Sequence, residues 1–474
     1  MRESYSMQNQ KQSKGLNIQA KFFVTSCLII FALMCLVYIL TFIVPGGEYA
    51  RTMDADGNML IDASGAFTYV DGGLPFWKWL LSPILVLIAE GSGTIIAIIV
   101  FLLVIGGVFN SLDKCGLMSY MLDKIVHHFR ARRYKMLAIM ILFFMALGAF
   151  IGSFEECVPL VPIVVALAIS MGWDDLTGLG MSLLAAGCGF AAGVCNPFTI
   201  GVAQELAGLP MFSGIWFRLV CFVVIYLILF AFIYLHAKKV ERPVTAESMA
   251  TNFCTDQKMD KSLCLFAGIL GTGIVLVMCS AILPALQDYT MIIVAVMFLV
   301  AGVTSVLTTG MKGKEFGIHF WNGLVSIFPA VLMILMASSI KYTLVEANIL
   351  DTVLFKAVEV AEHLPKEAVI LFIYLIVLLM NFFISSGSAK AFLLVPLVVP
   401  LAQIFNISAQ LSITAFAFGD GFSNVFYPTN PVLLISLGLA NVSYVKWVKW
   451  TWKFQTINLV ATALLLLVGL AIGY

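Results

Sequence analysis

The chain has 474 residues, of which 61% are hydrophobic and only 11% are charged, with a mean hydropathy of +1.02. Soluble domains carry about 25% charged residues, so the composition excludes a soluble globular protein and indicates a polytopic membrane protein with the lipid bilayer as a partner. The formal net charge is +1, which argues against a nucleic-acid partner.

Seven apolar segments are long enough to cross a bilayer, which needs roughly 20 apolar residues. In chain order these spans are predicted at 22–44, 84–109, 214–236, 262–284, 288–308, 323–342 and 455–474. The segment 444–453 alternates aromatic residues with lysines, which is typical of an anchor in the membrane interface.

The loops between the spans differ in charge. Residues 1–21 are expected to form a cytoplasmic tail, and the loop 111–135 and the linker 237–261 are basic. The loops 45–82 and 343–367 are acidic. By the positive-inside rule, the tail and the basic segments are cytoplasmic and the acidic loops lie outside.

Two further stretches combine an apolar arm, a short polar tip and an apolar return arm with prolines. We predict hairpins over 136–171 and 368–406. Their tips hold Ser153, Glu155 and Glu156 in the first, and Ser385, Ser386, Ser388 and Lys390 in the second. Irregular polar backbone survives at membrane depth only when it is buried in protein or lines a water-filled cavity. Both hairpins are therefore predicted to be re-entrant.

A discontinuous helix is predicted after each hairpin, at 176–208 and at 411–440. The breaks fall near Asn196-Pro197 and Asn430-Pro431, because proline lacks a backbone donor and disfavours helix at the residue before it. Asn196 and Asn430 are therefore expected on unwound backbone, next to Thr199 and Thr429.

The hairpins and broken helices belong to an internal repeat. An offset of 233 residues aligns Phe150 with Phe383 and, with a slip of one residue, Asn196 with Asn430. The span 262–284 has no counterpart, so an odd number of crossings separates the hairpins. We therefore predict an all-α membrane fold with two inverted repeats, 22–236 and 262–474, a pattern typical of secondary transporters.

Charged groups at membrane depth cost at least about 2.5 kcal/mol each on insertion scales, so they indicate function. The predicted substrate-binding residues are Ser153, Glu155, Glu156, Asn196, Thr199, Ser385, Ser386, Ser388, Lys390, Thr429 and Asn430. Asp420 and Glu156 are predicted to serve the coupling ion. Structural alternatives remain: the glutamates would cap a helix, Lys390 would pair with Asp420 or a hairpin glutamate, and Arg218 would extend toward the interface.

Acidic residues outnumber basic ones at this site, which favours a cationic or zwitterionic solute such as an amino acid over a dicarboxylate. No cofactor is expected apart from a sodium ion or proton as coupling ion. His127 and His128 are adjacent and lack the spacing of a metal site. A Walker A motif is missing from the sequence, which argues against coupling to ATP.

The paired motifs GSFEECVPLVP…CNPFTIG and SSGSAKAFLLVP…YPTNPVL resemble the YfcC group of the C4-dicarboxylate anaerobic carrier family, within the ion transporter superfamily. The resemblance covers nearly all of the chain from about residue 22. It implies a scaffold domain, a transport domain that holds both hairpins, an elevator mechanism and a homodimer. Members carry names as basic amino-acid antiporters or as dicarboxylate carriers.

We therefore expect a transporter of the bacterial inner membrane, not an enzyme, that moves a basic amino acid such as arginine or ornithine by exchange or ion coupling. The alternative substrate is a C4-dicarboxylate or another carboxylate, coupled to sodium or protons. A channel and a membrane enzyme are the rival classes. A channel would need a more regular selectivity filter, and an enzyme would need a nucleophile with a base, or metal ligands, at depth.

Overall fold

The structure is a computed structural model. It describes residues 20–53, 59–61, 67–89, 92–129, 132–152, 154–210, 212–242, 256–282, 290–361 and 363–474. The predicted N-terminal tail lies outside this range except for its last two residues. Most of the predicted linker, 243–255, also lies outside the described residues.

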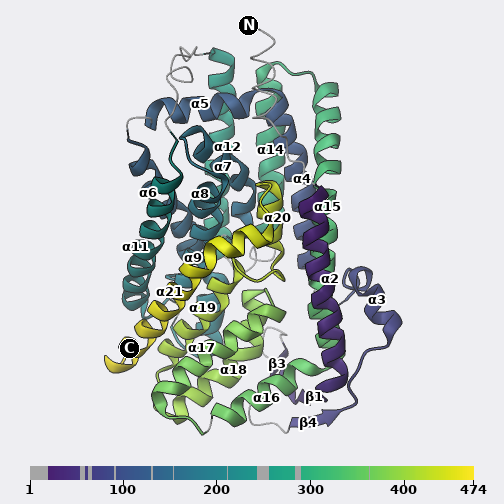
Figure 1. Ribbon diagram of the computed structural model, residues 1–474, viewed down its shortest axis with the longest axis vertical. Coiled ribbons are helices and arrows are strands. Elements are labelled where there is room, and N and C mark those ends of the chain that lie inside the picture. Colours follow the sequence, from purple (N-terminus) through teal and green to yellow (C-terminus); the bar gives the residue numbers. More distant parts are fainter. Residues whose placement is uncertain are drawn as a thin grey trace.

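The described chain is almost entirely helical (Figure 1). In the first half the helices are α2 (Ala20–Ile43), α3 (Phe76–Leu85), α4 (Ser92–Lys114), α5 (Leu117–Phe129), α6 (Arg133–Ala146), η2 (Leu147–Ile151), η3 (Glu155–Leu160), α7 (Val161–Ser170), α8 (Asp175–Leu179), η4 (Gly180–Leu184), α9 (Ala185–Ala192), η5 (Pro197–Gly201), α10 (Val202–Leu206) and α11 (Ile215–Val240). In the second half they are α12 (Gln257–Ile282), α14 (Thr290–Thr309), α15 (Gly313–Glu346), α16 (Ile349–Ala361), α17 (Lys366–Phe383), α18 (Gly387–Ile404), α19 (Ala409–Asn424), α20 (Pro431–Leu439) and α21 (Tyr444–Ala471).

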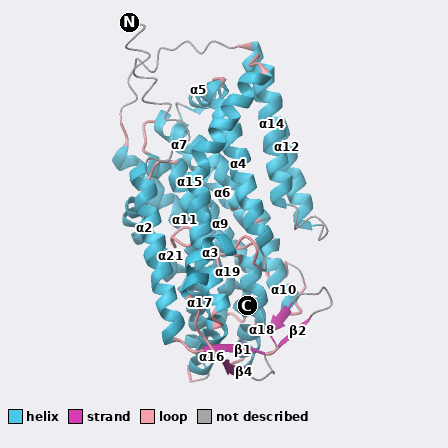
Figure 2. Cartoon of the chain, turned by 90° about the vertical axis from the view of Figure 1, so that its right-hand side faces the viewer, coloured by secondary structure: helices cyan, strands magenta, loops and turns pink. Residues whose placement is uncertain are grey.

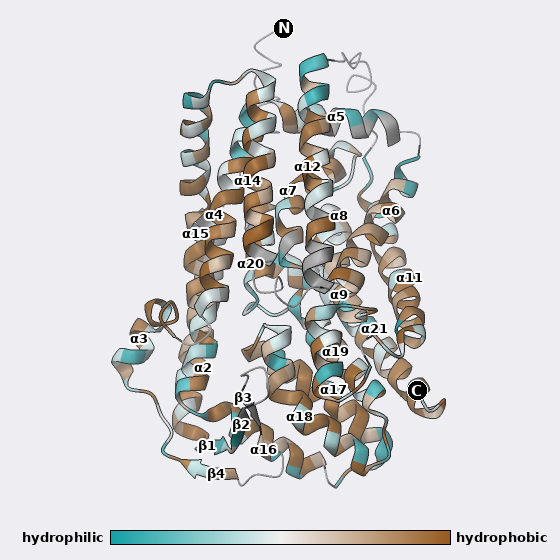
Figure 3. Ribbon diagram, turned by 180° about the vertical axis from the view of Figure 1, so that it is seen from behind, coloured by the Kyte–Doolittle hydropathy of each residue, from teal (hydrophilic) through white to brown (hydrophobic). Residues whose placement is uncertain are grey.

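Within the described residues, nine helical segments are long and apolar enough to cross a membrane. The outer faces of the described helices carry large apolar side chains, such as Ile43, Leu235 and Trp321, that are about two-thirds exposed. Such an exposed apolar surface would be unfavourable in water, whereas it is favourable in contact with lipid tails. Figure 3 shows hydrophobic residues along the lengths of these helices and hydrophilic ones concentrated toward the two ends of the molecule. The chain is a multi-pass membrane protein.

Two long helices, α4 and α15, form the centre of one side of the molecule, where α2, α3 and α14 pack against them. Their backbones meet at glycines. A Cβ on Gly323 would lie only 2.2 Å from the carbonyl oxygen of Gly106, and a Cβ on Gly107 only 2.5 Å from the ring of Phe320. Small residues allow this close approach. The resulting van der Waals contacts stabilise helix packing in lipid, where the hydrophobic effect does not drive helices together.

Elements related by the 233-residue offset have closely similar bounds. The offset carries α5 onto residues 350–362, close to the bounds of α16 at 349–361, and α6 with η2 onto residues 366–384, close to the bounds of α17 at 366–383. Figures 1 and 2 place α5 and α16 at opposite ends of the molecule. An inverted pair would have this arrangement; the inverted repeat stays a prediction.

The expectation of an all-α chain is wrong for the loop 45–82. There β1 (Gly46–Tyr49) pairs antiparallel with β4 (Phe67–Val70), and β2 (Arg51–Met53) with β3 (Met59–Ile61). The backbone N–H of Tyr49 donates to the Asp351 carboxylate at 3.0 Å, which ties β1 to α16. These strands gather at the end of the molecule that holds α16 (Figure 2).

Two predicted helix boundaries also need correction. The span expected at 84–109 is divided, since α3 ends at Leu85 and α4 begins at Ser92. The anchor at 444–453 and the last span at 455–474 form one continuous helix, α21. Nothing in that region breaks a helix, because Ser443 caps its start and no proline interrupts it.

Candidate functional site

The two helix breaks have the same local geometry. Asn196 and Asn430 both adopt extended backbone, with φ/ψ of −60°/113° and −84°/117°. Each side-chain Oδ1 accepts a hydrogen bond from the backbone N–H two residues later, at 3.0 Å from Phe198 and 2.9 Å from Val432. Proline follows at the first helical position in both cases, where its missing donor is tolerated. Asn-Pro is therefore an N-cap that restarts a helix after the break.

The first predicted hairpin doubles back within the molecule. Arg133, at the start of α6, donates to the carbonyl oxygen of Met171, just after α7, at 3.4 Å. The rings of Tyr134 and Trp173 pack 5.8 Å apart at the same place. The two ends of the segment are thus adjacent. Its turn passes through Gly152 at φ +80°, a left-handed conformation that glycine adopts readily.

Both hairpin tips contact the break in the first discontinuous helix, near Asn196. A Cβ on Gly152 would lie 2.3 Å from Asn196 Oδ1, and the N–H of Cys195 donates to the carbonyl of Ala149 at 3.0 Å. At the second tip, a Cβ on Gly387 would lie 2.6 Å from Thr199 Cγ2 and 2.9 Å from Asp420 Oδ2. Glycine lets both tips approach closely.

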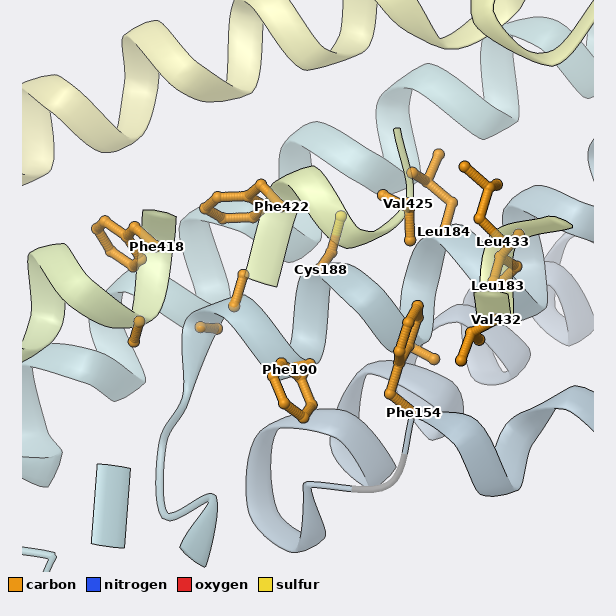
Figure 4. Close-up of a cluster of buried hydrophobic side chains, with 14 of the residues drawn as sticks. Phe154, Leu183, Leu184, Cys188, Phe190, Phe418, Phe422, Val425, Val432 and Leu433 are labelled. Carbon is orange, nitrogen blue, oxygen red and sulfur yellow. The ribbon is translucent and has the colours of Figure 1, made fainter. Parts of the chain in front are cut away.

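The second break completes the cluster. Figure 4 shows Phe154, from the first tip, beside Val432 and Leu433, which begin α20. The first segments of the two broken helices also cross, because a Cβ on Gly421 would lie 2.2 Å from the Cα of Ala191. Both tips and both breaks therefore converge in one region.

The charged centre of this region is an ion pair between Lys390 and Asp420. Lys390 lies in the first turns of α18 and Asp420 near the end of α19, and neither residue is exposed. A buried carboxylate and a buried ammonium are tolerated at such depth only as partners. The sequence analysis offered Asp420 or a hairpin glutamate as a structural partner of Lys390, and in the structure Lys390 pairs with Asp420. In this conformation the lysine charge is already neutralised.

A network of amides and hydroxyls surrounds the pair. Asn381 accepts a hydrogen bond from Lys390 through its Oδ1. Its Nδ2 lies 2.9 Å from the carbonyl of Asp420, 2.6 Å from Ser423 Oγ and 3.0 Å from Asn424 Oδ1. Asn424 Oδ1 also accepts from Asn430 Nδ2 at 2.9 Å. The network thus connects hairpin two to the break before α20.

Three of the predicted substrate-binding residues present buried polar atoms that have no hydrogen-bond partner among the described residues: Asn196 Nδ2, Thr199 Oγ1 and Thr429 Oγ1. Asn196 and Thr199 are fully buried, and Thr429 is 6% exposed. A buried polar group without a partner costs about 1–3 kcal/mol, so such groups are rarely retained. These atoms are candidates for contacts with a solute.

The remaining predicted residues are less enclosed. Ser385 and Ser388 are half-buried, and Ser386 is exposed and caps α18 by accepting from the N–H of Ala389 at 3.4 Å. Glu155 is half-buried at the start of η3. Ser153 lies outside the described residues, and the side chain of Glu156 is not described.

The sequence reasoning missed Asn381, Ser423 and Asn424. A signal for Asn381 was available, because it is an amide within the apolar run LFIYLIVLLMNFF. Buried polar residues in membrane helices mark functional sites by default. Ser423 and Asn424 belong to the polar end of α19 just before the break, which had no distinguishing pattern.

The expectation that Arg218 extends toward the interface is wrong. Arg218 is fully buried and donates to the carbonyl of Val194 at 3.2 Å, to the carbonyl of Ser213 at 2.9 Å and to Tyr474 Oη at 3.1 Å. It therefore holds a carbonyl that the first break leaves free. At the second break, Trp447 Nε1 donates to the carbonyl of Val425 at 2.7 Å. The span after each broken helix thus satisfies a carbonyl of its break.

Within the part of the chain that the structure describes, no group of three or more His, Cys, Asp or Glu residues is placed to hold a metal ion. Among the described residues, the oxygens of Asp420 and Asn381 could hold a monovalent cation, and they face the Lys390 ammonium.

Among the solved structures that match this chain are two transport proteins of low sequence identity. The YdaH transporter of Alcanivorax borkumensis is 17% identical, with coverage of 95% of this chain and 98% of that chain and a TM-score of 0.44. MtrF of Neisseria gonorrhoeae, described with a class of antimetabolite efflux pumps, is 16% identical, with coverage of 93% and 94% and a TM-score of 0.45.

Comparison of sequences is more informative. A protein of Escherichia coli K12 named "Putative basic amino acid antiporter YfcC" is 28% identical over 382 residues, which cover 75% of this chain and 74% of that chain. The family model described as DcuC, the C4-dicarboxylate anaerobic carrier, matches residues 23–471. Together with the helical membrane fold, this match over nearly the whole chain shows that the protein belongs to the C4-dicarboxylate anaerobic carrier family.

Proposed function

We propose that this membrane transporter moves a basic amino acid, of the arginine or ornithine type, by exchange or ion coupling. The observation that carries the proposal is the charge balance of the site. Lys390 and Asp420 neutralise each other, and Glu155 forms no ion pair within the described residues. With Glu155 ionised, the described site would have a net negative charge, which a cationic solute would balance.

The unpartnered atoms of the site fit the rest of such a solute. Thr199 Oγ1 and Thr429 Oγ1 can accept from an ammonium group, and Asn196 Nδ2 can donate to a carboxylate. Helix N-termini at the breaks would attract the same carboxylate. The name of the Escherichia coli relative, a basic amino-acid antiporter, agrees with this assignment.

The transport cycle is proposed to be of the elevator type, with both hairpins and both broken helices in a mobile domain. The close contacts among these elements support their movement as one unit, whereas α4 and α15 pack against each other through glycines. We also propose a homodimer in the bacterial inner membrane with a cytoplasmic N-terminus, on the basis of loop charge and family resemblance.

A carboxylate carrier coupled to sodium or protons is the second candidate. It is favoured by the three helices that begin in the site, α18, η5 and α20, because their N-termini present partial positive charge. Their caps are already occupied by Ser386, Asn196 and Asn430, which reduces this attraction.

Counterflow in proteoliposomes distinguishes the candidates. Vesicles loaded with one unlabelled solute are tested for uptake of labelled arginine, ornithine, lysine, neutral amino acids, aspartate, succinate and fumarate. We expect exchange of basic amino acids and rejection of succinate. Glu155→Gln and Glu156→Gln should reduce this exchange at least tenfold, whereas Glu367→Gln, at the exposed start of α17, serves as the matched control. Succinate exchange without a response to arginine would overturn the proposal.

A further inference from the structure

The ammonium of Lys390 is surrounded by oxygens. The structure gives it two partners, the carboxylate of Asp420 and the side-chain Oδ1 of Asn381, and all three residues are buried. The orientation of the Asn381 amide follows from its other contacts. Its Nδ2 lies 2.9 Å from the carbonyl oxygen of Asp420, which can only accept, so Oδ1 must face the lysine.

This set of ligands is the one that a hard cation prefers. Carboxylate and amide oxygens bind such ions, and nitrogen or sulfur ligands select other metals. Asp420 also lies one turn before the end of α19, whose C-terminal carbonyls carry partial negative charge. In broken-helix transporters, unwound carbonyls and C-terminal half-helix ends coordinate the coupling ion. The Lys390 ammonium thus occupies a position built for a cation.

The first repeat has no equivalent of this position. The 233-residue offset places Cys157 at Lys390, Gly187 at Asp420 and Gly148 at Asn381. Both the cation and its oxygen ligands are missing from the counterpart. The lysine and its oxygen ligands are therefore present together in the second half and absent together from the equivalent positions of the first, as expected if they perform a single task.

We propose that the Lys390 ammonium is a built-in substitute for the coupling cation, so that transport does not require Na⁺, and that removing the ammonium creates a Na⁺ site at Asp420 and Asn381. This inference rests on the proposed function for its transport prediction, but the Na⁺ site itself does not depend on the substrate. A lysine is covalently part of hairpin two, so its charge is not released on either side of the membrane.

The first test measures the wild-type protein. Counterflow is followed in vesicles that contain either NaCl or choline chloride at equal ionic strength. We expect equal rates in the two salts. A strict requirement for Na⁺, with at least a tenfold loss in choline chloride, would overturn the inference and would leave the proposed substrate intact.

The second test measures the melting temperature of purified protein as NaCl replaces choline chloride. Lys390→Ala should show a saturable, Na⁺-specific rise in Tm of about 2 °C or more, and the wild type should show none. The double variant K390A/D420N, which lacks both charges, should lose the response. Lys341→Ala, which removes a half-buried lysine from α15, is the matched control and should not respond.

Two outcomes of the second test contradict the inference: a folded K390A that gives no Na⁺-specific shift, and a K390A/D420N variant that responds as strongly as K390A. If K390A does not fold, the wild-type comparison of the two salts still decides the question. Absence of any amino-acid exchange would refute the proposed function alone, because the thermal response to Na⁺ needs no substrate.

Discussion

The two Asn-Pro breaks offer a quantitative comparison between equivalent positions. Replacing Asn196 with alanine removes one N-cap hydrogen bond, at 3.0 Å, which should destabilise the protein by about 1 kcal/mol. Replacing Asn430 removes the matching cap at 2.9 Å and also the bond from its Nδ2 to Asn424 Oδ1. The second bond adds about 1 kcal/mol, so the total is about 2 kcal/mol.

Thermal unfolding in detergent measures the difference. At about 2 °C per kcal/mol for a large domain, Asn196→Ala should lower Tm by about 2 °C and Asn430→Ala by about 4 °C. Serine retains a capping oxygen, so Asn196→Ser should recover nearly all of the loss and Asn430→Ser about half. Equal losses at the two positions, or no recovery with serine, would refute the assignment of both residues as caps.

The same variants separate capping from solute binding at Asn196. Asn196→Ser keeps the cap and removes Nδ2, which has no partner within the described residues. We expect exchange to fall at least tenfold although Tm is nearly unchanged. Exchange at the wild-type rate would show that the Asn196 amide does not contact the solute.

Three further variants test other contacts. Gly387→Ala places a Cβ 2.6 Å from Thr199 Cγ2, so exchange should slow more than tenfold, whereas Gly268→Ala, with open space around it, should leave the rate within twofold. Arg218→Ala should lower the stability by about 3 kcal/mol, since charged hydrogen bonds contribute about 1.5–3 kcal/mol each, and Arg218→Lys should recover less than half in a thermal melt, because lysine lacks the planar fork. Asp174, at the edge of the membrane spans, is partly buried, which raises its pKa, but hydrogen bonds from His236 and Thr177 outweigh this effect and lower the pKa to about 2. Its ionised form therefore stabilises the fold above the unfolded pKa of about 3.9. Asp174→Asn should lower stability by about 1–2 kcal/mol at pH 7, and the difference should shrink as pH falls from about 4 toward 2; a difference that is constant with pH would contradict the ionic origin.

Much of the architecture could be predicted because lipid permits few solutions. Backbone polar groups at membrane depth must be satisfied within the chain, so hydropathy, prolines and loop charge locate spans and breaks. The breaks before Pro197 and Pro431 follow from proline chemistry alone. The strands of the loop 45–82 were not predicted, because they lie outside the lipid and are held by a distant carboxylate, Asp351.

The sequence was sufficient to identify the charged residues of the site but not to show which of them form ion pairs. Composition and spacing identified Lys390, Asp420 and Glu155 as charged residues at membrane depth, where the free-energy cost of insertion indicates a functional role. They did not show that Lys390 reaches Asp420, 30 residues away, or that Asn381 completes its oxygen ligands. Arg218 was misplaced for the same reason, since its partners Val194, Ser213 and Tyr474 come from three different segments.

The amino-acid sequence by itself determined that this chain crosses a membrane and which residues carry charge or break helices at depth. It also predicted that the two halves of the chain repeat one another. These properties depend on single residues and their neighbours in the chain. The tertiary structure decided which of those charges cancel and which polar atoms are left without partners. That outcome depends on the helix packing at Gly387 and Gly421, where contacts of a few ångströms join segments far apart in the sequence.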